Sequence, residues 1–251
     1  MIKILPIASG STGNCMLLDF GGQRVMIDLG VTAKAAQAAL CQNGYTWDDI
    51  GAVLITHTHI DHVKGLEVCL KRIHAPVYMS AVSRDKLTLE RAEVLPYTGR
   101  TEILPGVWVT PVRTSHDCPG SIGFLIETAD TRVGYVTDLG VMPESTLKLL
   151  EGADCVVIES NHDEEMLRYG PYPVYLKKRI LSDRGHLSNE AASAAVAWLA
   201  ERGTRHFLLA HLSRENNRPE IALAGALQAT AGMDVDIRVL PVCGTEMFVI
   251  R

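Results

Sequence analysis

The chain has 251 residues, a length that fits one substantial domain or two small ones. Hydrophobic residues make up 47% of it and charged residues 21%, a balance that excludes disordered, collagen-like and low-complexity chains. The formal net charge of -5 excludes a protein that holds nucleic acid by long-range charge alone, so a bound polyanion would need a local site.

Short apolar runs rich in β-branched residues alternate with helical patterns along the chain. Strands are predicted at residues 2–7, 15–20, 24–28, 52–56, 107–112, 122–127, 132–137, 155–159, 206–210, 235–240 and 247–250. Helices are predicted at residues 33–42, 61–72, 84–93, 144–151, 188–202 and 219–231. Ser188 is the expected N-cap of its helix, and Glu190 in the first turn favours the same start.

The order of these elements predicts an α/β fold. Hairpin-like strands come first and βα units follow, and the second half of the chain repeats this order. The arrangement favours two sheets packed together with helices outside, a four-layer αββα sandwich. A doubly wound parallel sheet would alternate strands and helices more regularly. We expect residues 1–251 to form a single domain made of two similar lobes.

The location of the protein is predicted from two features. The N-terminal apolar run is broken by Pro6 and is too short for a signal peptide or a membrane span. The six cysteines are scattered and contain no CxxC pair, which favours reduced thiols over a disulfide framework. We therefore expect a cytoplasmic protein with no membrane partner.

The strongest chemical signal is the segment His57-Thr-His59-Ile-Asp61-His62. It follows an apolar run that predicts a buried strand. In extended backbone, residues two apart point the same way, so His57 and His59 converge on one point. Asp61 and His62 then open a helix and can face a second point close by. Imidazoles and carboxylates in this density suit zinc or manganese, whereas the alternative is a surface loop that is rich in histidine by chance.

Three further candidate ligands follow predicted strands, namely His116, Asp138 and His211. Taken singly, each has an ordinary explanation. A lone histidine after a strand is more often a core or surface residue, and an aspartate before Leu-Gly is usually a turn residue. Taken together with the first segment, they complete a set of five histidines and two aspartates.

This set resembles the metallo-β-lactamase superfamily, whose HxHxDH, H, D and H pattern is filled at every position. The resemblance covers essentially the whole chain and implies the αββα sandwich. It also implies a binuclear centre in which Asp138 bridges two divalent metal ions, zinc or manganese, with iron a further option. The implied ligands of the first ion are His57, His59 and His116, and those of the second are Asp61, His62 and His211.

The resemblance also implies a reaction. Glutamate in place of His59 would be typical of flavodiiron oxidoreductases, and cysteine in place of Asp138 of many true β-lactamases, but neither is present. The expected chemistry is hydrolysis by a metal-bridging hydroxide, which Asp61 is the best candidate to orient. A centre with residual positive charge favours an anionic substrate such as a phosphodiester.

Three polar segments are candidates for binding that substrate. The first is the Ser9–Asn14 turn SGSTGN, the second is Gly185-His186-Leu-Ser-Asn before a predicted helix, and the third follows His211. The alternatives are an ordinary glycine-rich turn, a helix-start residue and ordinary turn chemistry. The candidate substrate-binding residues are Ser9, Ser11, Asn14, Ser213, Asn216 and Asn217.

These segments are similar to a narrower group of the superfamily, the YycJ (WalJ)-type proteins. The shared stretches are SGSTGN, ESNHDEEML, GHLSN and HLSRENN. The group is associated with metal-dependent 5′-to-3′ exonuclease activity on DNA. His186 also resembles a histidine of the ribonuclease Z branch that assists protonation of the leaving group, and we carry that role over as a hypothesis.

Two further features bear on the substrate. The stretch between Asp138 and His211 is too short for the clamp domain of the β-CASP nucleases. Within it, residues 168–184 interleave aromatic and basic side chains, namely Tyr172, Tyr175, Lys177, Lys178 and Arg179. This mixture suits single-stranded DNA or a 5′ end, although a solvated helix face with tyrosines packed beneath it explains the pattern equally well. A small-molecule hydrolase, such as a cyclic-phosphate phosphodiesterase, thioesterase or lactonase, is the alternative function. A non-catalytic, metal-stabilised interaction module is the third hypothesis. The oligomeric state is not predicted.

Overall fold

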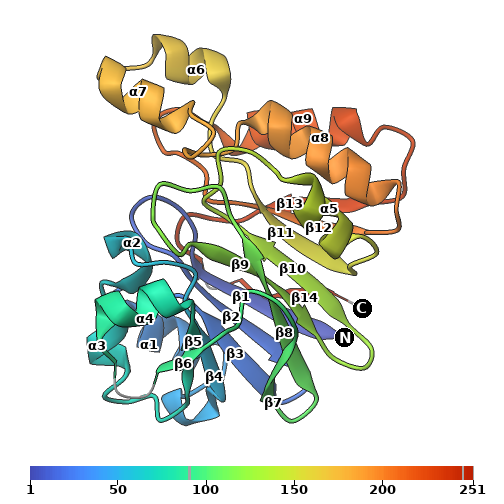
Figure 1. The fold of residues 1–251 in the computed structure, drawn as a ribbon. Coiled ribbons are helices and arrows are strands. Elements are labelled where there is room, and N and C mark those ends of the chain that lie inside the picture. Colours follow the sequence, from blue (N-terminus) through green and yellow to red (C-terminus); the bar gives the residue numbers. More distant parts are fainter. Residues whose placement is uncertain (90–91, 245, 251) are drawn as a thin grey trace.

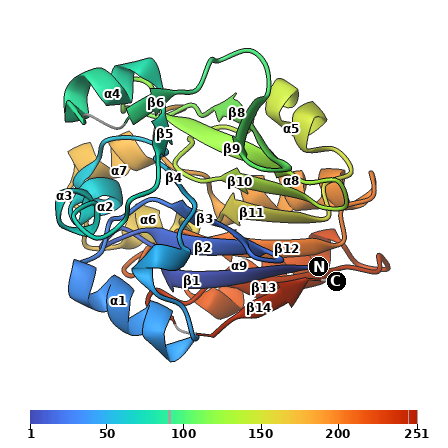
Figure 2. The same cartoon turned by 90° about the horizontal axis from the view of Figure 1, so that it is seen from below.

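The computed structural model describes residues 1–89, 92–244 and 246–250 of the chain, and their strands form two seven-stranded sheets that face each other (Figures 1 and 2). The first sheet has the order β14 (Phe248–Ile250), β1 (Ile2–Ala8), β2 (Cys15–Phe20), β3 (Gln23–Ile27), β4 (Ala52–Leu54), β5 (Val77–Met79), β6 (Ala92–Val94). The second has the order β13 (Asp236–Val239), β12 (His206–Ala210), β11 (Cys155–Glu159), β10 (Arg132–Val136), β9 (Ile122–Glu127), β8 (Val107–Arg113), β7 (Thr101–Leu104).

Helices cover the outer face of each sheet (Figure 2). The first sheet carries α1 (Ala33–Gln42), α2 (Ile60–Val63), α3 (Leu66–Cys69) and α4 (Ala81–Leu87), with a short 3₁₀ turn at Trp47–Asp49. The second carries α5 (Glu144–Leu150), α8 (Asn189–Ala200) and α9 (Pro219–Ala229). The helices α6 (Glu164–Tyr169) and α7 (Val174–Ile180) project beyond the end of the second sheet (Figure 1).

Alternating side chains on each strand build three apolar layers. On β11, Cys155 and Val157 face the other sheet, whereas Val156 and Ile158 pack against α8 and α9. Burial of an aliphatic side chain of this size contributes roughly 1.5–3 kcal/mol. One apolar layer therefore lies between the two sheets, and one lies between each sheet and its helices. These layers confirm the predicted four-layer arrangement.

The two sheets share a topology that places polar residues at one edge. Strands β3, β4, β5 and β6 are parallel to one another, as are β10, β11, β12 and β13. Antiparallel pairs β2–β3 and β9–β10 precede each parallel set. The carboxyl ends of parallel strands lie at one edge of their sheet, so residues that follow β3, β10, β11 and β12 approach one another there.

Every predicted strand is present, with bounds shifted by no more than two residues. The predicted continuous helix at 61–72 is wrong, because Gly65 separates α2 from α3. Gly65 packs directly against Val31, and a Cβ on Gly65 would lie 1.9 Å from the Val31 carbonyl oxygen. The prediction at 84–93 is also wrong beyond Leu87, where α4 ends and Ala92–Val94 forms an edge strand; its residues 90 and 91 lie outside the described residues.

The short strands β5, β6 and β7 and the helices α6 and α7 were not predicted. Ser188 does cap α8, since its Oγ accepts a hydrogen bond from the amide of Ala191 at 3.3 Å. Across the described segments, none of the helices has both the length and the apolar character needed to cross a membrane.

Candidate metal centre

Three residues that follow strands adopt left-handed backbone at the shared edge. Asp28 after β3 has a φ of 56°, Asp138 after β10 has 59°, and His211 after β12 has 57°. Residues other than glycine rarely adopt this region, and each costs on the order of 1–3 kcal/mol. Such conformations persist only where the surrounding contacts hold them, so this edge is built to hold particular side chains in place.

One group of imidazoles comprises His57, His59 and His116, whose ligand atoms all lie within 4.8 Å of one another. His57 Nε2 and His116 Nε2 each lie 3.2 Å from His59 Nδ1. The other ring nitrogens of two of them contact protein: His57 Nδ1 lies 3.0 Å from Thr56 Oγ1, and His116 Nδ1 lies 3.2 Å from the Gly185 carbonyl oxygen. The three imidazoles could hold one metal ion.

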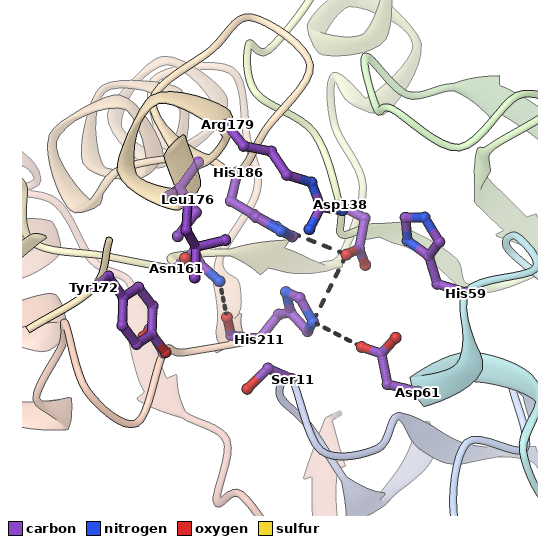
Figure 3. Close-up of a pocket in the computed structure, with 12 residues that line it drawn as sticks. Ser11, His59, Asp61, Asp138, Asn161, Tyr172, Leu176, Arg179, His186 and His211 are labelled. Carbon is purple, nitrogen blue, oxygen red and sulfur yellow. Dashed lines mark hydrogen bonds and ion pairs between the residues drawn. The ribbon is translucent and has the colours of Figure 1, made fainter. Parts of the chain in front are cut away.

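A second group comprises Asp61, His62 and His211. Asp61 Oδ2 lies 3.6 Å from His62 Nε2 and 3.8 Å from His211 Nε2. Figure 3 shows His211 between the carboxylates of Asp61 and Asp138.

Asp138 contacts both groups. Its carboxylate oxygens lie 3.4 Å from His62 Nε2, 3.7 Å from His211 Nε2 and 3.8 Å from His116 Nε2. The structure thus brings all seven predicted ligand residues into one cluster, with Asp138 between the two groups.

The donor atoms of this cluster fit a divalent cation. Asp138 Oδ2 and His211 Nε2 are buried and have no hydrogen-bond partner among the described residues. A buried polar atom without a partner costs about 1–3 kcal/mol, and a metal ion between these atoms would satisfy them. Imidazole nitrogens and carboxylate oxygens are the ligands that zinc and manganese accept. The residues therefore fit a metal centre.

Glu159, at the end of β11, supports two of the histidines. It begins the ESNHDEEML stretch shared with the YycJ-type proteins, but this supporting role was not predicted. It is fully buried, and its Oε1 accepts hydrogen bonds from His186 Nδ1 at 2.8 Å and His211 Nδ1 at 2.7 Å. Its Oε2 accepts from the amides of Leu139 and Leu187 at 3.0 and 3.1 Å. Burial raises the pKa of Glu159, but the two imidazoles outweigh burial and hold the pKa below its usual value. Each imidazole is therefore fixed with Nε2 free.

Asp28 supports the first half of the cluster in the same way. It is fully buried, and its Oδ2 accepts from His62 Nδ1 at 2.7 Å, while Thr56 donates from its amide at 2.9 Å and its hydroxyl at 2.8 Å. Burial raises the pKa of Asp28 above its usual value despite these bonds. Burial also lowers the pKa of His62, but the carboxylates of Asp138 and Asp28 outweigh it and raise that pKa to about 8.

A pocket of about 240 Å³ opens over the cluster (Figure 3). His186 lines it, with Nδ1 held by Glu159 and 3.7 Å from Asp138 Oδ1. Arg179 of α7 also lines it and forms a two-point ion pair with Asp117. The lining residues are Ser11, His59, Asp61, Asp138, Asn161, Tyr172, Leu176, Arg179, Ile180, His186, His211 and Ser213.

Of the six candidate substrate-binding residues, the structure places Ser11 and Ser213 at the pocket wall. Ser9 is buried, and its hydroxyl accepts a hydrogen bond from the His211 amide at 2.8 Å. Asn14 is also buried, with Oδ1 2.9 Å from the Gly10 amide.

The two remaining candidates are buried beside the same pocket wall. Asn217 Nδ2 donates to the Ser160 carbonyl and to Asn189 Oδ1, both at 2.9 Å. Asn216 Nδ2 lies 3.5 Å from Ser213 Oγ. These bonds hold the loops that carry Ser213 and His211, so the buried candidates support the pocket wall.

Comparison with known proteins places the chain in a family. A family model described as a beta-lactamase superfamily domain matches residues 23–212. The chain belongs to the metallo-β-lactamase superfamily. Exodeoxyribonuclease YycJ of Bacillus anthracis is 33% identical over 222 residues, which cover 86% of this chain and 84% of the relative. Exodeoxyribonuclease WalJ of Streptococcus pneumoniae is 32% identical over 247 residues, 93% of this chain and 91% of the relative.

Structural similarity extends over the whole superfamily fold. The crystal structure of the metallo-beta-lactamase fold protein YhfI from Bacillus subtilis has a TM-score of 0.76 at 17% identity, and covers 99% of this chain and 100% of its own. The comparisons confirm the predicted family, its YycJ-type branch and its fold. Membership of this superfamily implies divalent metal ions at the clustered side chains.

Proposed function

We propose that the protein is a cytoplasmic, metal-dependent exodeoxyribonuclease that removes nucleotides from the 5′ end of DNA. The observation that carries the proposal is the cluster of seven ligand-type side chains at the floor of a pocket edged by Arg179. Similarity over most of the chain to two proteins named exodeoxyribonuclease supports DNA as the substrate.

The proposed centre holds two ions, zinc or manganese, with iron a further option. His57, His59 and His116 would bind one ion, and Asp61, His62 and His211 would bind the other. Asp138 reaches both groups. When bound, the ions supply Lewis-acid stabilisation of the charge that develops on the phosphate oxygens.

Asp61 and His186 act on protons in this proposal. Asp61 lines the pocket and accepts a hydrogen bond from the attacking hydroxide, which orients it toward the phosphorus. Glu159 holds a proton at His186 Nδ1, so only Nε2 exchanges a proton with the pocket. His186 then donates from Nε2 to the departing sugar oxygen.

The pocket wall supports the choice of substrate. Arg179 pairs with Asp117 through Nε and Nη2, and among the described residues its Nη1 is left to donate to a phosphate oxygen, while Ser11 and Ser213 add hydroxyl groups. Tyr172 offers a ring beside which a terminal base can stack. A cavity of about 240 Å³ beneath α7 favours the end of a single strand over an intact duplex.

The test uses purified protein supplied with manganese or zinc, and two copies of one oligonucleotide labelled at either the 5′ or the 3′ end. We expect the 5′ label to be released as a mononucleotide at once, whereas the 3′-labelled strand shortens step by step. Chelation should abolish both, and added metal should restore both. Turnover of bis-p-nitrophenyl phosphate with no attack on either strand would contradict the proposal and favour a small-molecule hydrolase.

A further inference from the structure

A second hollow lies behind the candidate ligand His116, on the loop that joins β8 to β9. Its volume is about 370 Å³. His116 lines this hollow, while its ring also contacts His59 at 3.2 Å. The residues that line the hollow are Tyr97, Arg113, Thr114, Ser115, His116, Cys118, Pro119, Gly120, Ser121 and Arg184.

Arg113 contributes a cation that the fold leaves unneutralised. Its guanidinium lies over the ring of Tyr97, 4.6 Å from the ring centroid, and the side chain is exposed. Within residues 1–89, 92–244 and 246–250, this guanidinium has no hydrogen bond and no ion pair. By contrast, Arg24 also lies near an aromatic ring but pairs with Asp19 and Asp49 at 3.2 Å.

Arg184 supplies the second cation of the hollow. Its Nε and Nη2 both donate to the carbonyl oxygen of His116 at 3.3 Å, which fixes the guanidinium against the loop. None of the described lining residues is acidic. Two acids adjoin lining residues in sequence, Asp117 beside His116 and Asp183 beside Arg184, but neither lines the hollow. Asp117 instead pairs with Arg179 on the side of the metal centre. Two guanidiniums without a carboxylate make a local positive site on a chain whose net charge is -5.

We propose that this hollow is a second phosphate-binding subsite, which holds a backbone phosphate of the same strand whose end occupies the pocket. The inference rests on the proposed function for the identity of the ligand. Guanidinium groups pair with phosphate oxygens in two-point geometry, and contacts of this kind position a strand without reading its sequence. Residues 115–117 separate the two hollows, so a strand that leaves the pocket crosses this short loop and reaches Arg113 and Arg184.

The experiment measures binding apart from turnover. The metal-loaded protein is titrated with a fluorescent hexanucleotide and a dinucleotide whose phosphorothioate linkages keep the charge but resist hydrolysis. The variants are Arg113→Ala and Arg113→Lys. The matched control is Arg202→Ala, since Arg202 also lies over an aromatic ring, Trp198 at 3.8 Å, but at the opposite end of α8 from the centre.

Arg113→Ala should weaken hexanucleotide binding about ten-fold and reduce the slope of log K against log salt by about 0.7. Dinucleotide binding and the turnover of bis-p-nitrophenyl phosphate should not change. Arg113→Lys should retain the slope, and Arg202→Ala should behave as wild type. Equal hexanucleotide binding by wild type and Arg113→Ala, or equal losses in Arg113→Ala and Arg202→Ala, would overturn the subsite.

The result is separable from the proposed function. Loss of hexanucleotide binding in Arg113→Ala, without hydrolysis of DNA by the wild type, would support the subsite and contradict the nuclease. Hydrolysis of DNA by the wild type, with hexanucleotide binding unaltered in Arg113→Ala, would support the nuclease and contradict the subsite.

Discussion

The same turn occurs once in each half of the molecule, with different consequences. Asp28-Leu-Gly follows β3 and Asp138-Leu-Gly follows β10, and each of these strands is the first of its parallel set. Both aspartates adopt left-handed backbone, and both leucines are fully buried. Both glycines are required, because a Cβ at Gly30 would lie 1.6 Å from the Asp61 carbonyl oxygen, and one at Gly140 would lie 2.3 Å from that of Ser182.

The neighbours of each aspartate determine what it does. Asp28 is closed off from the pocket and bonds to His62 Nδ1 and Thr56, and burial raises its pKa. Asp138 lines the pocket among imidazoles; burial raises its pKa too, but His211 and His62 outweigh burial and lower it. One backbone turn therefore presents a supporting acid in one half and a ligand-type acid in the other.

Exchange of each carboxylate for an amide is the strongest test of this difference. Asp138→Asn should lower kcat/KM about 1,000-fold, because the amide removes the charge that the two groups of candidate metal ligands share. Asp28→Asn should lower metal affinity only about ten-fold, because His62 keeps its place in the cluster. Steady-state kinetics and metal titration of both variants measure the two effects.

Each substitution is the control for the other, since both are isosteric and each lies at the first position of one of the two Asp-Leu-Gly turns. Equal losses of activity at saturating metal would show that the difference between the two halves has no functional meaning.

The next test concerns His186, the imidazole that Glu159 holds in the second half. His186→Gln should lower kcat about 100-fold, the usual effect of losing a general acid, while the metal content stays as in wild type. Elemental analysis measures the metal content and single-turnover kinetics measures the rate of the chemical step, so together they distinguish a general acid from a metal ligand. Loss of a metal ion would instead make His186 a ligand, and full turnover would remove it from the mechanism.

The smallest effect is the pH dependence of metal binding. The pKa of His62 is raised to about 8, so His62 is mostly protonated at pH 7 in the metal-free protein. Burial lowers the pKa of His211, but carboxylates, chiefly that of Asp138, outweigh burial and raise that pKa as well, which acts in the same direction. A ligand imidazole must be neutral, and binding at pH 7 should therefore release protons. Affinity should rise about ten-fold per pH unit for each proton released, and the His62 contribution should level off above about pH 8.

Calorimetry in buffers of different ionisation enthalpy counts these protons. Asp28→Asn should reduce the number released, because it removes one of the carboxylates that raise the pKa of His62. An unchanged number would contradict the role given to Asp28.

The sequence predicted the parts of the molecule whose pattern is local. Long β-branched runs located the inner strands, and histidines at strand ends located the candidate ligands. The strands β5 and β6 have three residues each, too few for a period to appear. The helices α6 and α7 are short and separated by Gly170 and proline residues, so their pattern reads as a loop.

The supporting acids were harder to identify, because their roles depend on contacts distant in sequence. Glu159 ends an apolar strand and reads as its last residue, yet it contacts His211, which comes from another strand. Asp28 was included in a predicted strand. The repeated Asp-Leu-Gly was the available signal, since it matches the tripeptide at Asp138.

The left-handed backbone at Asp28, Asp138 and His211 has a consequence for engineering. Glycine adopts this conformation without steric penalty, but at Asp28 it would leave His62 and Thr56 without their buried acceptor, and at His211 it would leave Glu159 without a donor. A net relief of strain is expected only at Asp138, whose Oδ2 has no hydrogen-bond partner among the described residues. A directed-evolution screen that rewards heat resistance alone would thus be drawn toward glycine at Asp138, a candidate metal ligand. Thermostable descendants of this enzyme should be selected for turnover at the same time.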